Sequence, residues 1–386
     1  MIYVIGLDSD STFMHFLRTA TEQGAEIRAV NLHAVIDSGG WRLRVPDDGD
    51  SWLKTSGETI SMDPMGCYYT RIIDLSRVQT DARMSARWAG LITALQAWLE
   101  NIPGRVVNRP GKVSLHNSTK PLHEEFLRRS GFNVPSSLTS SKRGDLVEFS
   151  RAGKTIVKTV SGIRANARIV GEAEVAEADL SFSPVHLQRF VSGADIRAHV
   201  VGEDVHSEMI ESEDTDYRSG DGRREFAAHT CPADLNRKMV RATRDMGLDM
   251  AGWDFKLSPD GTYWCLEANP MPGYDGYDRR LGGRITSSLL HLLRAEGVPE
   301  SAAAQPPPFG EGDSADGRTR QSCELPGNPD GAQHVSDALP APGTRADGHQ
   351  RQRQAAAQSV DRAHDDQRLQ APSRGAQRGP VQQDRR

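Results

Sequence analysis

The segment 251–273 constrains the fold of this chain more than any other stretch, because it predicts a β-hairpin with charged residues on one face only. Its sequence is AGWDFKLSPDGTYWCLEANPMPG. The central Ser258-Pro259-Asp260-Gly261 predicts a tight turn, since proline fixes φ, aspartate bonds the turn backbone and glycine accepts positive φ. We therefore expect strands at Trp253–Leu257 and Tyr263–Ala268, paired antiparallel.

The two faces of this hairpin differ in chemistry, because successive side chains of a strand point to opposite faces. Alternate apolar side chains are expected to share one face, namely Trp253, Phe255, Leu257, Trp264, Leu266 and Ala268. Asp254, Glu267 and Asn269 then fall on the opposite face, with Asp254 nearly across from Glu267. Cys265 is expected on that same side.

Two carboxylates and an amide oxygen beside an apolar wall indicate a bound cation, because such a cluster costs free energy unless a positive charge lies within it. Oxygen-only ligands suit a hard cation, and Mg²⁺ beside substrate phosphates is the usual case. The prolines of Asn269-Pro270-Met271-Pro272-Gly273 predict a rigid, non-helical exit that fixes the asparagine. The alternative interpretation is an ordinary solvated hairpin face.

Length and composition favour an enzyme of the cytoplasm. The chain has 386 residues, enough for two or three compact units, and its net charge of −5 gives no overall basic balance for nucleic acid. No apolar run reaches the roughly 20 residues that span a bilayer, and MIYVIGLDSD lacks the features of a signal peptide. The cysteines are scattered without a Cys-x-x-Cys pair, which indicates free thiols in a reducing compartment. We therefore expect neither membrane nor nucleic acid among the partners.

Composition changes sharply near Val298. Residues 298–386 contain no Ile, Lys, Met, Trp or Tyr, and Phe309 is their only aromatic residue. Such a segment cannot bury enough apolar surface to offset the entropy of ordering it, so we predict a low-complexity, disordered tail. Translation out of the ancestral reading frame in GC-rich DNA is one hypothesis for this composition.

The N-terminal part predicts an α/β arrangement. Residues 1–33 read as strand, helix and strand, with Asp10 or Ser11 capping the helix. The turn between the first strand and the helix reads GLDSDS rather than Gly-x-Gly-x-x-Gly, so a dinucleotide site is not supported. A long amphipathic helix follows, and its apolar stripe is expected in the core: Trp88, Leu91, Ile92, Leu95, Trp98 and Leu99.

Further elements are predicted between this helix and the end of the hairpin region. Lys120 stands at the start of a helix that carries Leu122, Phe126 and Leu127, where anions are favoured. Lys158 lies in a strand that precedes Ser161-Gly162-Ile163-Arg164, whose glycine lets backbone N–H groups approach phosphate. Three more elements are expected: a helix at 232–249, a loop at 274–281 and a helix at Ile285–Leu293. The helix at 232–249 should turn four apolar residues inward, namely Leu235, Met239, Val240 and Met246.

Asp254 followed by Glu267-x-Asn269-Pro270 resembles the metal-binding signature of the ATP-grasp superfamily, and especially of the branch containing the ligase that adds glutamate to ribosomal protein S6. The resemblance implies that Asp254, Glu267 and Asn269 bind two Mg²⁺ ions with Glu267 bridging, Mn²⁺ being the alternative ion. ATP is the implied nucleotide.

Other segments resemble the nucleotide site of this branch. The pattern Ser-x-Lys-Pro, helix, Gly-Phe-x-Val-Pro-x-Ser-Leu resembles the opening of the ATP-grasp domain, which implies that Lys120 reaches the nucleotide phosphates. Lys158 matches the lysine that contacts the α- and β-phosphates. The strand and turn at 186–193 resemble the hinge between the two lobes, where backbone groups of Gln188, Arg189, Phe190 and Val191 would bind adenine.

Two arginines are implied to be catalytic. Asp195-x-Arg197 resembles a pair that positions a substrate carboxylate or peptide; we count Asp195 with the cofactor-binding residues, and the alternative is an ordinary cross-strand ion pair. The segment 214–218 resembles an Asp-Tyr-Arg motif that brings Arg218 towards the γ-phosphate or the acceptor.

The resemblance covers roughly residues 105–295 and implies an α/β (α+β) ATP-grasp fold. We expect a pre-ATP-grasp α/β domain with a β-α-β start at 1–110, the small lobe at 111–190, the large lobe with the metal site at 191–297 and the tail at 298–386.

The implied activity is that of an ATP-dependent carboxylate–amine ligase that forms an acylphosphate and acts on an amino acid, a peptide or a protein. A peptide macrocyclase that forms side-chain ester or amide links in a ribosomal precursor is the second hypothesis. The third is a non-catalytic nucleotide-binding module, against which the intact Asp254, Glu267 and Asn269 argue. Members of this branch often form dimers or tetramers, so a homo-oligomer is also expected.

Overall fold

A computed structural model describes residues 1–110, 119–158, 168–180, 184–212 and 223–295 of the chain. Three segments singled out in the sequence lie outside these residues: the loop 161–164, the segment 214–218 with Arg218, and the tail 298–386. Within the described ranges, no helix combines the length and the apolar character needed to cross a membrane.

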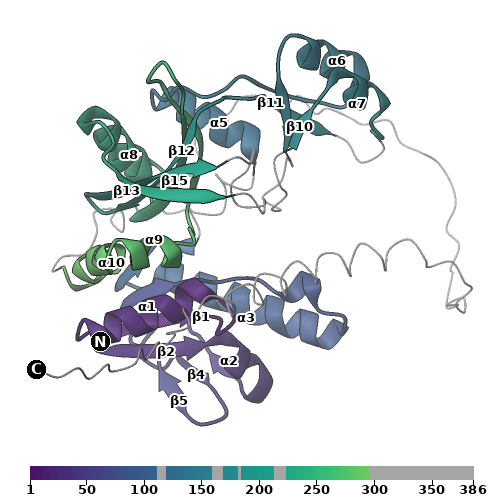
Figure 1. The fold of residues 1–386 in the computed structure, drawn as a ribbon. Helices are drawn as coiled ribbons and strands as arrows, with labels where there is room; N and C mark the ends of the chain where they lie inside the picture. The colour runs from purple at the N-terminus through teal and green to yellow at the C-terminus, as the bar shows by residue number, and fades with distance from the viewer. Residues whose placement is uncertain (111–118, 159–167, 181–183, 213–222, 296–386) are drawn as a thin grey trace, which may run out of the picture. The chain divides into compact units, whose positions relative to one another are not determined.

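A parallel four-stranded sheet in the order β2-β1-β6-β7 forms the N-terminal part (Figure 1). Its strands are β1 (Ile2–Gly6), β2 (Ile27–Asn31), β6 (Cys67–Thr70) and β7 (Arg105–Val107). Helix α1 (Ser11–Glu22) joins β1 to β2, and the Asp10 side chain caps it by accepting a hydrogen bond from Thr12 N at 2.9 Å. The predicted β-α-β start is confirmed.

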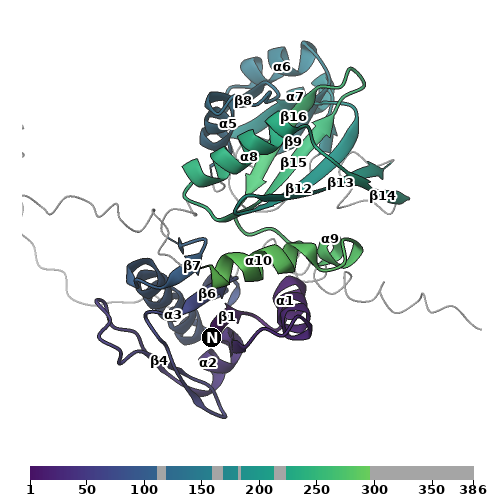
Figure 2. The same ribbon diagram turned by 90° about the vertical axis from the view of Figure 1, so that its left-hand side faces the viewer.

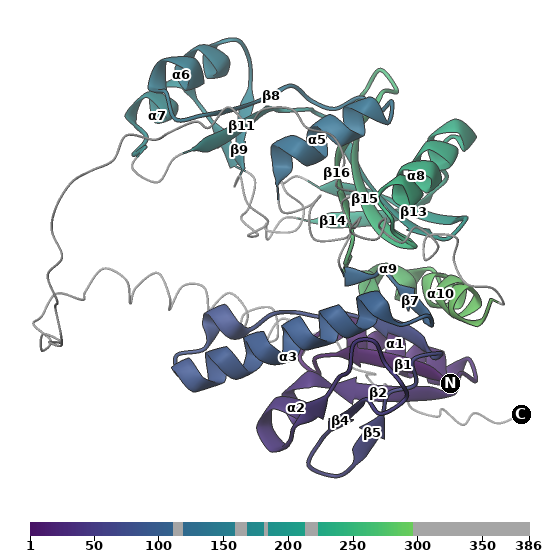
Figure 3. The same ribbon diagram turned by 180° about the vertical axis from the view of Figure 1, so that it is seen from behind.

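The long amphipathic helix predicted from the Trp/Leu stripe is α3 (Ala82–Asn101), and all six residues of that stripe are buried, as predicted. Figure 3 shows α3 beside the N-terminal strands, whose side chains share one hydrophobic cluster with it. The connecting elements are α2 (Leu32–Ser38), the small antiparallel sheet of β3 (Trp41–Arg42), β4 (Trp52–Lys54) and β5 (Thr59–Ser61), and the 3₁₀ turn η1 (Ser76–Val78).

An antiparallel sheet in the order β10-β9-β11-β8 follows helix α5 (Lys120–Arg129). Its strands are β8 (Ser137–Ser140), β9 (Thr155–Lys158), β10 (Arg168–Val170) and β11 (Val185–Arg189). Helices α6 (Arg143–Arg151) and α7 (Glu172–Glu177) lie on one side of it (Figure 1). Leu187 of β11 packs with Leu146 and Val175 of these helices, so the alternate residues of β11 face the other way.

The second large sheet is antiparallel, in the order β14-β13-β12-β15-β16. Its strands are β12 (Ala194–Val201), β13 (Asp204–Ser212), β14 (Arg224–His229), β15 (Met250–Leu257) and β16 (Tyr263–Asn269). Helix α8 (Ala233–Asp245) lies along one face (Figure 2). The four residues predicted to point inward from this helix region, Leu235, Met239, Val240 and Met246, are all buried.

Residues 274–281, which we expected as a loop, instead contain helix α9 (Asp275–Arg280), and α10 (Arg284–Arg294) is the predicted last helix. The buried Asp278 explains this ordering: its carboxylate accepts hydrogen bonds from Ile285 N and Thr286 N and contacts His15 Nε2 of α1 at 2.8 Å. This network connects α9, the start of α10 and helix α1, and side chains of β1 and α1 share a hydrophobic cluster with α10.

Asn108, just after β7, joins the N-terminal sheet to the hairpin. Its backbone has a φ of 58°, unusual for a residue with a side chain. Its Nδ2 donates to Met250 O and Pro270 O at 2.8 and 2.5 Å, while its Oδ1 accepts from Asp249 N and Met250 N. One amide thus fixes both ends of the hairpin that carries the predicted metal ligands.

Candidate functional site

The predicted hairpin is strands β15 and β16, and its register brings Asp254 directly opposite Glu267, as expected. The turn is also as predicted: Gly261 has a φ of 82° and its N–H donates to Ser258 O at 2.9 Å. Asp254 is buried and Glu267 is half-buried. The two carboxylates therefore lie on one face of the sheet, within reach of one another.

The expected faces of the second strand were partly wrong, because a β-bulge lies between the pairs Asp254–Glu267 and Phe255–Cys265. Leu266 is the extra residue of this bulge, so the side chains of β16 that precede it point to the faces opposite to those that simple alternation predicts. Cys265 is fully buried in the apolar cluster with Phe255, on the side away from the carboxylates, and Trp264 pairs with Lys256. Burial raises the pKa of the Cys265 thiol well above its usual range, so this cysteine is an inert core residue.

Asp195 and Arg197 lie on the same face of β12, and each makes a cross-strand ion pair with β15. Arg197 Nη1 donates to Asp254 Oδ1 at 2.8 Å, and Lys256 Nζ contacts Asp195 Oδ2 at 2.8 Å. The ordinary ion pair that we held as the alternative is therefore present at both positions. The first of these pairs joins Arg197, predicted to be catalytic, to Asp254, a predicted metal ligand.

The Arg197 guanidinium is held from several sides. Its Nε donates to His199 Nε2 at 3.3 Å, and the ring of His199 also hydrogen-bonds the backbone of Gly273. Burial, together with the neighbouring Arg197, lowers the pKa of His199 well below its usual value, so the ring is neutral and can accept this bond. Gly252, paired with His199 across the strands, leaves the space that the guanidinium occupies, since a Cβ there would clash with Arg197.

The two predicted phosphate-binding lysines interact with one another, and Lys158 also interacts with these carboxylates. Lys120 is the first residue of α5, and Lys158 ends β9. Burial lowers the pKa of Lys158, while the carboxylates of Glu267 and Glu124 act in the opposite direction and Lys120 lowers it further. Because Asp254 also acts on Lys158, the two lysines and the hairpin carboxylates are coupled through Lys158, and these groups come from helix α5, strand β9 and the hairpin.

Glu124 is a buried member of this region that the sequence analysis missed. It lies on α5, where His123, Glu124 and Leu127 are buried, whereas Leu122 is exposed. The Glu124 carboxylate accepts from Gln188 Nε2 at 2.8 Å and contacts His186 Nε2 at 3.1 Å. Leu127 three residues further on was the available signal, because positions i and i+3 share a helix face.

The predicted hinge residues have defined positions at the end of β11. Gln188 is fully buried, while the Arg189 and Phe190 side chains make cation–π contacts with Phe149 and Lys154. The N–H groups of Arg189 and Phe190 donate to Ser136 O and Lys154 O. These two amides are thus used within the protein rather than offered to a nucleotide base.

The chemistry of the predicted metal ligands fits Mg²⁺. Among the residues described, no three His, Cys, Asp or Glu side chains gather in a way that could hold a metal ion; the predicted set has two carboxylates and one amide. Asn269 Oδ1 accepts from Met271 N at 2.9 Å, which fixes the amide as the prolines of this exit predicted. Oxygen ligands of this number suit Mg²⁺, which keeps waters and takes further oxygens from substrate phosphates.

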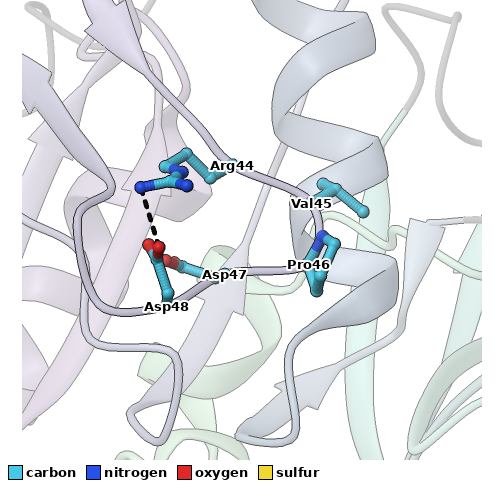
Figure 4. Close-up of a pocket in the computed structure, with 5 residues that line it drawn as sticks. All are labelled: Arg44, Val45, Pro46, Asp47 and Asp48. Atoms are coloured by element: carbon cyan, nitrogen blue, oxygen red, sulfur yellow. Dashed lines mark ion pairs between the residues drawn. The ribbon is translucent and has the colours of Figure 1, made fainter.

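A hollow of about 410 Å³ lies elsewhere, in the loop before β4 (Figure 4). It is lined by Arg44, Val45, Pro46, Asp47 and Asp48. The Arg44–Asp48 ion pair is solvent-exposed, and Asp47 accepts a hydrogen bond from Trp98 Nε1 at 2.6 Å. These contacts stabilise the loop, and the hollow shares no residue with the predicted site.

Comparison with known proteins defines the class of this fold. No family model matches the chain. The ATP-grasp ligase PsnB, solved with a phosphomimetic variant of its minimal precursor, Mg and ADP, superposes with a TM-score of 0.64 at 23% identity, over 76% of this chain and 98% of PsnB. The macrocyclase MdnC from Microcystis aeruginosa, solved with its precursor peptide MdnA, gives a TM-score of 0.64 at 15% identity over 76% of this chain and 99% of MdnC. The chain therefore has the ATP-grasp fold, as predicted.

The sequence points to one branch of that class. The ribosomal protein bS6–L-glutamate ligase of Escherichia fergusonii is 25% identical over 190 residues, which are 46% of this chain and 63% of that protein. The match thus covers less than two thirds of this relative. With the shared fold, this match shows that the chain resembles the glutamate ligases of the ATP-grasp superfamily.

Proposed function

We propose that this protein is an ATP-dependent carboxylate–amine ligase that acts through an acylphosphate, with a peptide or protein as substrate. The observation that carries the proposal is the cross-strand pairing of Asp254 with Glu267, whose carboxylates both act electrostatically on Lys158 at the end of β9, as does Lys120. Cations and carboxylates from two sheets are what a site for a metal–triphosphate complex requires. The likeness to glutamate ligases supports the reaction, and the likeness to ligases solved with precursor peptides supports a peptide substrate.

The proposed reaction has two steps. A substrate carboxylate oxygen bonds to the γ-phosphorus of ATP while the bond to the β–γ bridging oxygen breaks, which gives an acylphosphate and ADP. An amine nitrogen then attacks the acyl carbon, phosphate leaves, and the amine proton passes to solvent. The site contributes positioning and charge neutralisation, so no protein nucleophile is required.

The residues have separate roles in this proposal. Asp254, Glu267 and Asn269 would hold Mg²⁺, which neutralises charge on the phosphates when bound. Lys120 and Lys158 would bind phosphate oxygens, and Gln188 with the segment 189–191 would bind the base. Arg197, held by Asp254 and neutral His199, presents a guanidinium that suits a substrate carboxylate or the acylphosphate.

Several finer expectations stay predictions: the roles of Asp195 and Arg218, the domain boundaries, a cytoplasmic location, a homo-oligomer and Mn²⁺ as an alternative ion. Asp195 is engaged by Lys256, so its proposed contribution to the nucleotide site is indirect, through the position of that lysine.

The test is ATP consumption with Mg²⁺ in the presence of pooled amino acids and candidate peptides, followed by mass spectrometry. ADP and a product heavier by one condensation support a ligase. Loss of one water from a single peptide supports the macrocyclase hypothesis, which the likeness to MdnC favours. Nucleotide binding without ADP formation on any peptide or amino acid would contradict both and favour the non-catalytic module.

A further inference from the structure

A buried carboxylate organises the part of the site that lies beyond the phosphate-binding lysines. Glu124 is 2% exposed. Its Oε1 accepts from Gln188 Nε2 at 2.8 Å and contacts His186 Nε2 at 3.1 Å, and its Oε2 accepts from Ser137 Oγ. The proposed ligase reaction assigns no role to this residue.

These contacts fix the orientation of the Gln188 amide. An ionised carboxylate only accepts hydrogen bonds, so Gln188 must turn its NH₂ group towards Glu124 and its oxygen away. Burial alone raises the pKa of Glu124, but hydrogen bonds with His186 and Ser137 outweigh burial and lower it. The carboxylate is therefore ionised at neutral pH, and the reversed amide would set two acceptor oxygens against each other.

The oxygen that is turned away has no partner within the described part of the chain. Gln188 is fully buried, and no donor of these residues reaches its Oε1. Buried acceptors in native proteins are rarely left in this state, so the atom indicates a ligand that donates a hydrogen bond. Because Glu124 fixes the orientation of the Gln188 amide, Oε1 can only accept a hydrogen bond, and the ligand must supply the donor.

Gln188 lies on the same face of the sheet as Lys158. Lys158 pairs with His186, and Leu187 between His186 and Gln188 faces the α6–α7 side. Gln188 is therefore two residues, or about 7 Å, along the strand from the level of the lysine. That separation is within the span of one nucleoside triphosphate, with its phosphates at Lys158 and its base at Gln188.

We propose that Glu124 is a positioning residue for base selection: it fixes Gln188 Oε1 as an acceptor for the exocyclic amino group of adenine, so that the site selects 6-amino over 6-oxo purine nucleotides. This inference rests on the proposed function only in placing a nucleotide at Lys158. ATP donates a hydrogen bond from its 6-amino group, whereas inosine triphosphate presents an acceptor at the same position. Wild-type protein should bind inosine triphosphate about tenfold to a hundredfold more weakly than ATP, the usual effect of an unpaired buried polar group.

The experiment is calorimetric titration of the full chain with ATP and with inosine triphosphate, each with Mg²⁺. Glu124→Gln supplies an amide that can donate to Gln188 Oε1, so Gln188 can turn and the affinity ratio should fall towards one. Gln188→Met removes the acceptor and should lower the ratio similarly. Glu125→Gln is the matched control: this neighbour on α5 has 47% of its side chain exposed and pairs with Arg129, so its ratio should equal that of wild type.

We compare the ratio of the ATP and inosine triphosphate affinities rather than either affinity alone. Glu124 also acts on Lys158, so loss of the Glu124 charge changes the affinity for both triphosphates together. Equal affinity of wild type for the two nucleotides overturns base selection while leaving the proposed ligase intact. If Glu124→Gln folds and its ratio of ATP to inosine triphosphate affinity is undiminished, the positioning role is overturned. If that variant does not fold, Gln188→Met takes its place, and an undiminished ratio there overturns base selection. Absence of binding of either nucleotide by wild type would overturn the proposed function as well.

Discussion

Removing the Arg197 guanidinium tests the buried ion pair at the centre of the site. Arg197 and Asp254 are each 5% exposed and are joined by a hydrogen bond of 2.8 Å between charged groups. Arg197→Met keeps most of the side-chain volume but leaves the Asp254 carboxylate without this counter-charge. Breaking a buried pair from one side costs about 3–5 kcal/mol, because the remaining charge stays desolvated. We expect the free energy of unfolding in EDTA to fall by this amount.

Urea denaturation measures this loss of unfolding free energy, and two further variants serve as comparisons. The double variant Arg197→Met/Asp254→Asn removes both charges and should recover most of the loss. Arg151→Met is the control, since Arg151 and Glu172 form a pair with 65% and 44% of their side chains exposed, and it should cost less than about 1 kcal/mol. Excess Mg²⁺ should stabilise the single variant and not the double one. A loss for Arg197→Met no larger than that for Arg151→Met would refute the reasoning.

Three further predictions concern the metal, the phosphates and pH. Glu267→Ala should abolish Mg²⁺-dependent ATP turnover without changing the unfolding midpoint, and unchanged turnover would refute the metal assignment. Lys158→Met should weaken ATP binding about tenfold or more by calorimetry, whereas Lys142→Met, at an exposed position before α6, should bind as wild type does. Because burial lowers the pKa of His199 well below 6.5, the unfolded chain takes up a proton first as pH falls. Stability from neutral His199 is thus present above pH 6.5 and lost below it, by about 1.4 kcal/mol per pH unit. Urea unfolding should show a steeper loss between pH 7 and 5 for wild type than for His199→Gln, and equal slopes would contradict this.

The sequence predicted the hairpin and the pairing of its two carboxylates because both follow from local rules. A turn of known type fixes the register, and the register decides which side chains face each other. Helix α3 was predictable for a similar reason, since its apolar stripe has helical spacing and is buried as a whole.

Features that depend on distant residues were not predictable from local pattern. The bulge that moves Cys265 into the core lies where Cys265 N donates to Asn133 O, a residue far away in the chain. The Arg197–Asp254 pair required the neighbouring strand to be known. Glu124 and Glu125 are alike in sequence, and only the packing of α5 against β16, where Ala268 N donates to His123, shows which is buried.

Binding of a non-hydrolysable ATP analogue tests most directly whether this is a metal–triphosphate site. We would titrate AMP-PNP into wild type and into Asp254→Asn/Glu267→Gln, each with Mg²⁺ and with EDTA. Binding by wild type that is markedly tighter with Mg²⁺, together with loss of this Mg²⁺ dependence in the double variant, is the predicted result. Equal affinity of wild type with and without Mg²⁺, or an unchanged Mg²⁺ dependence in the variant, would contradict the assignment of the hairpin carboxylates.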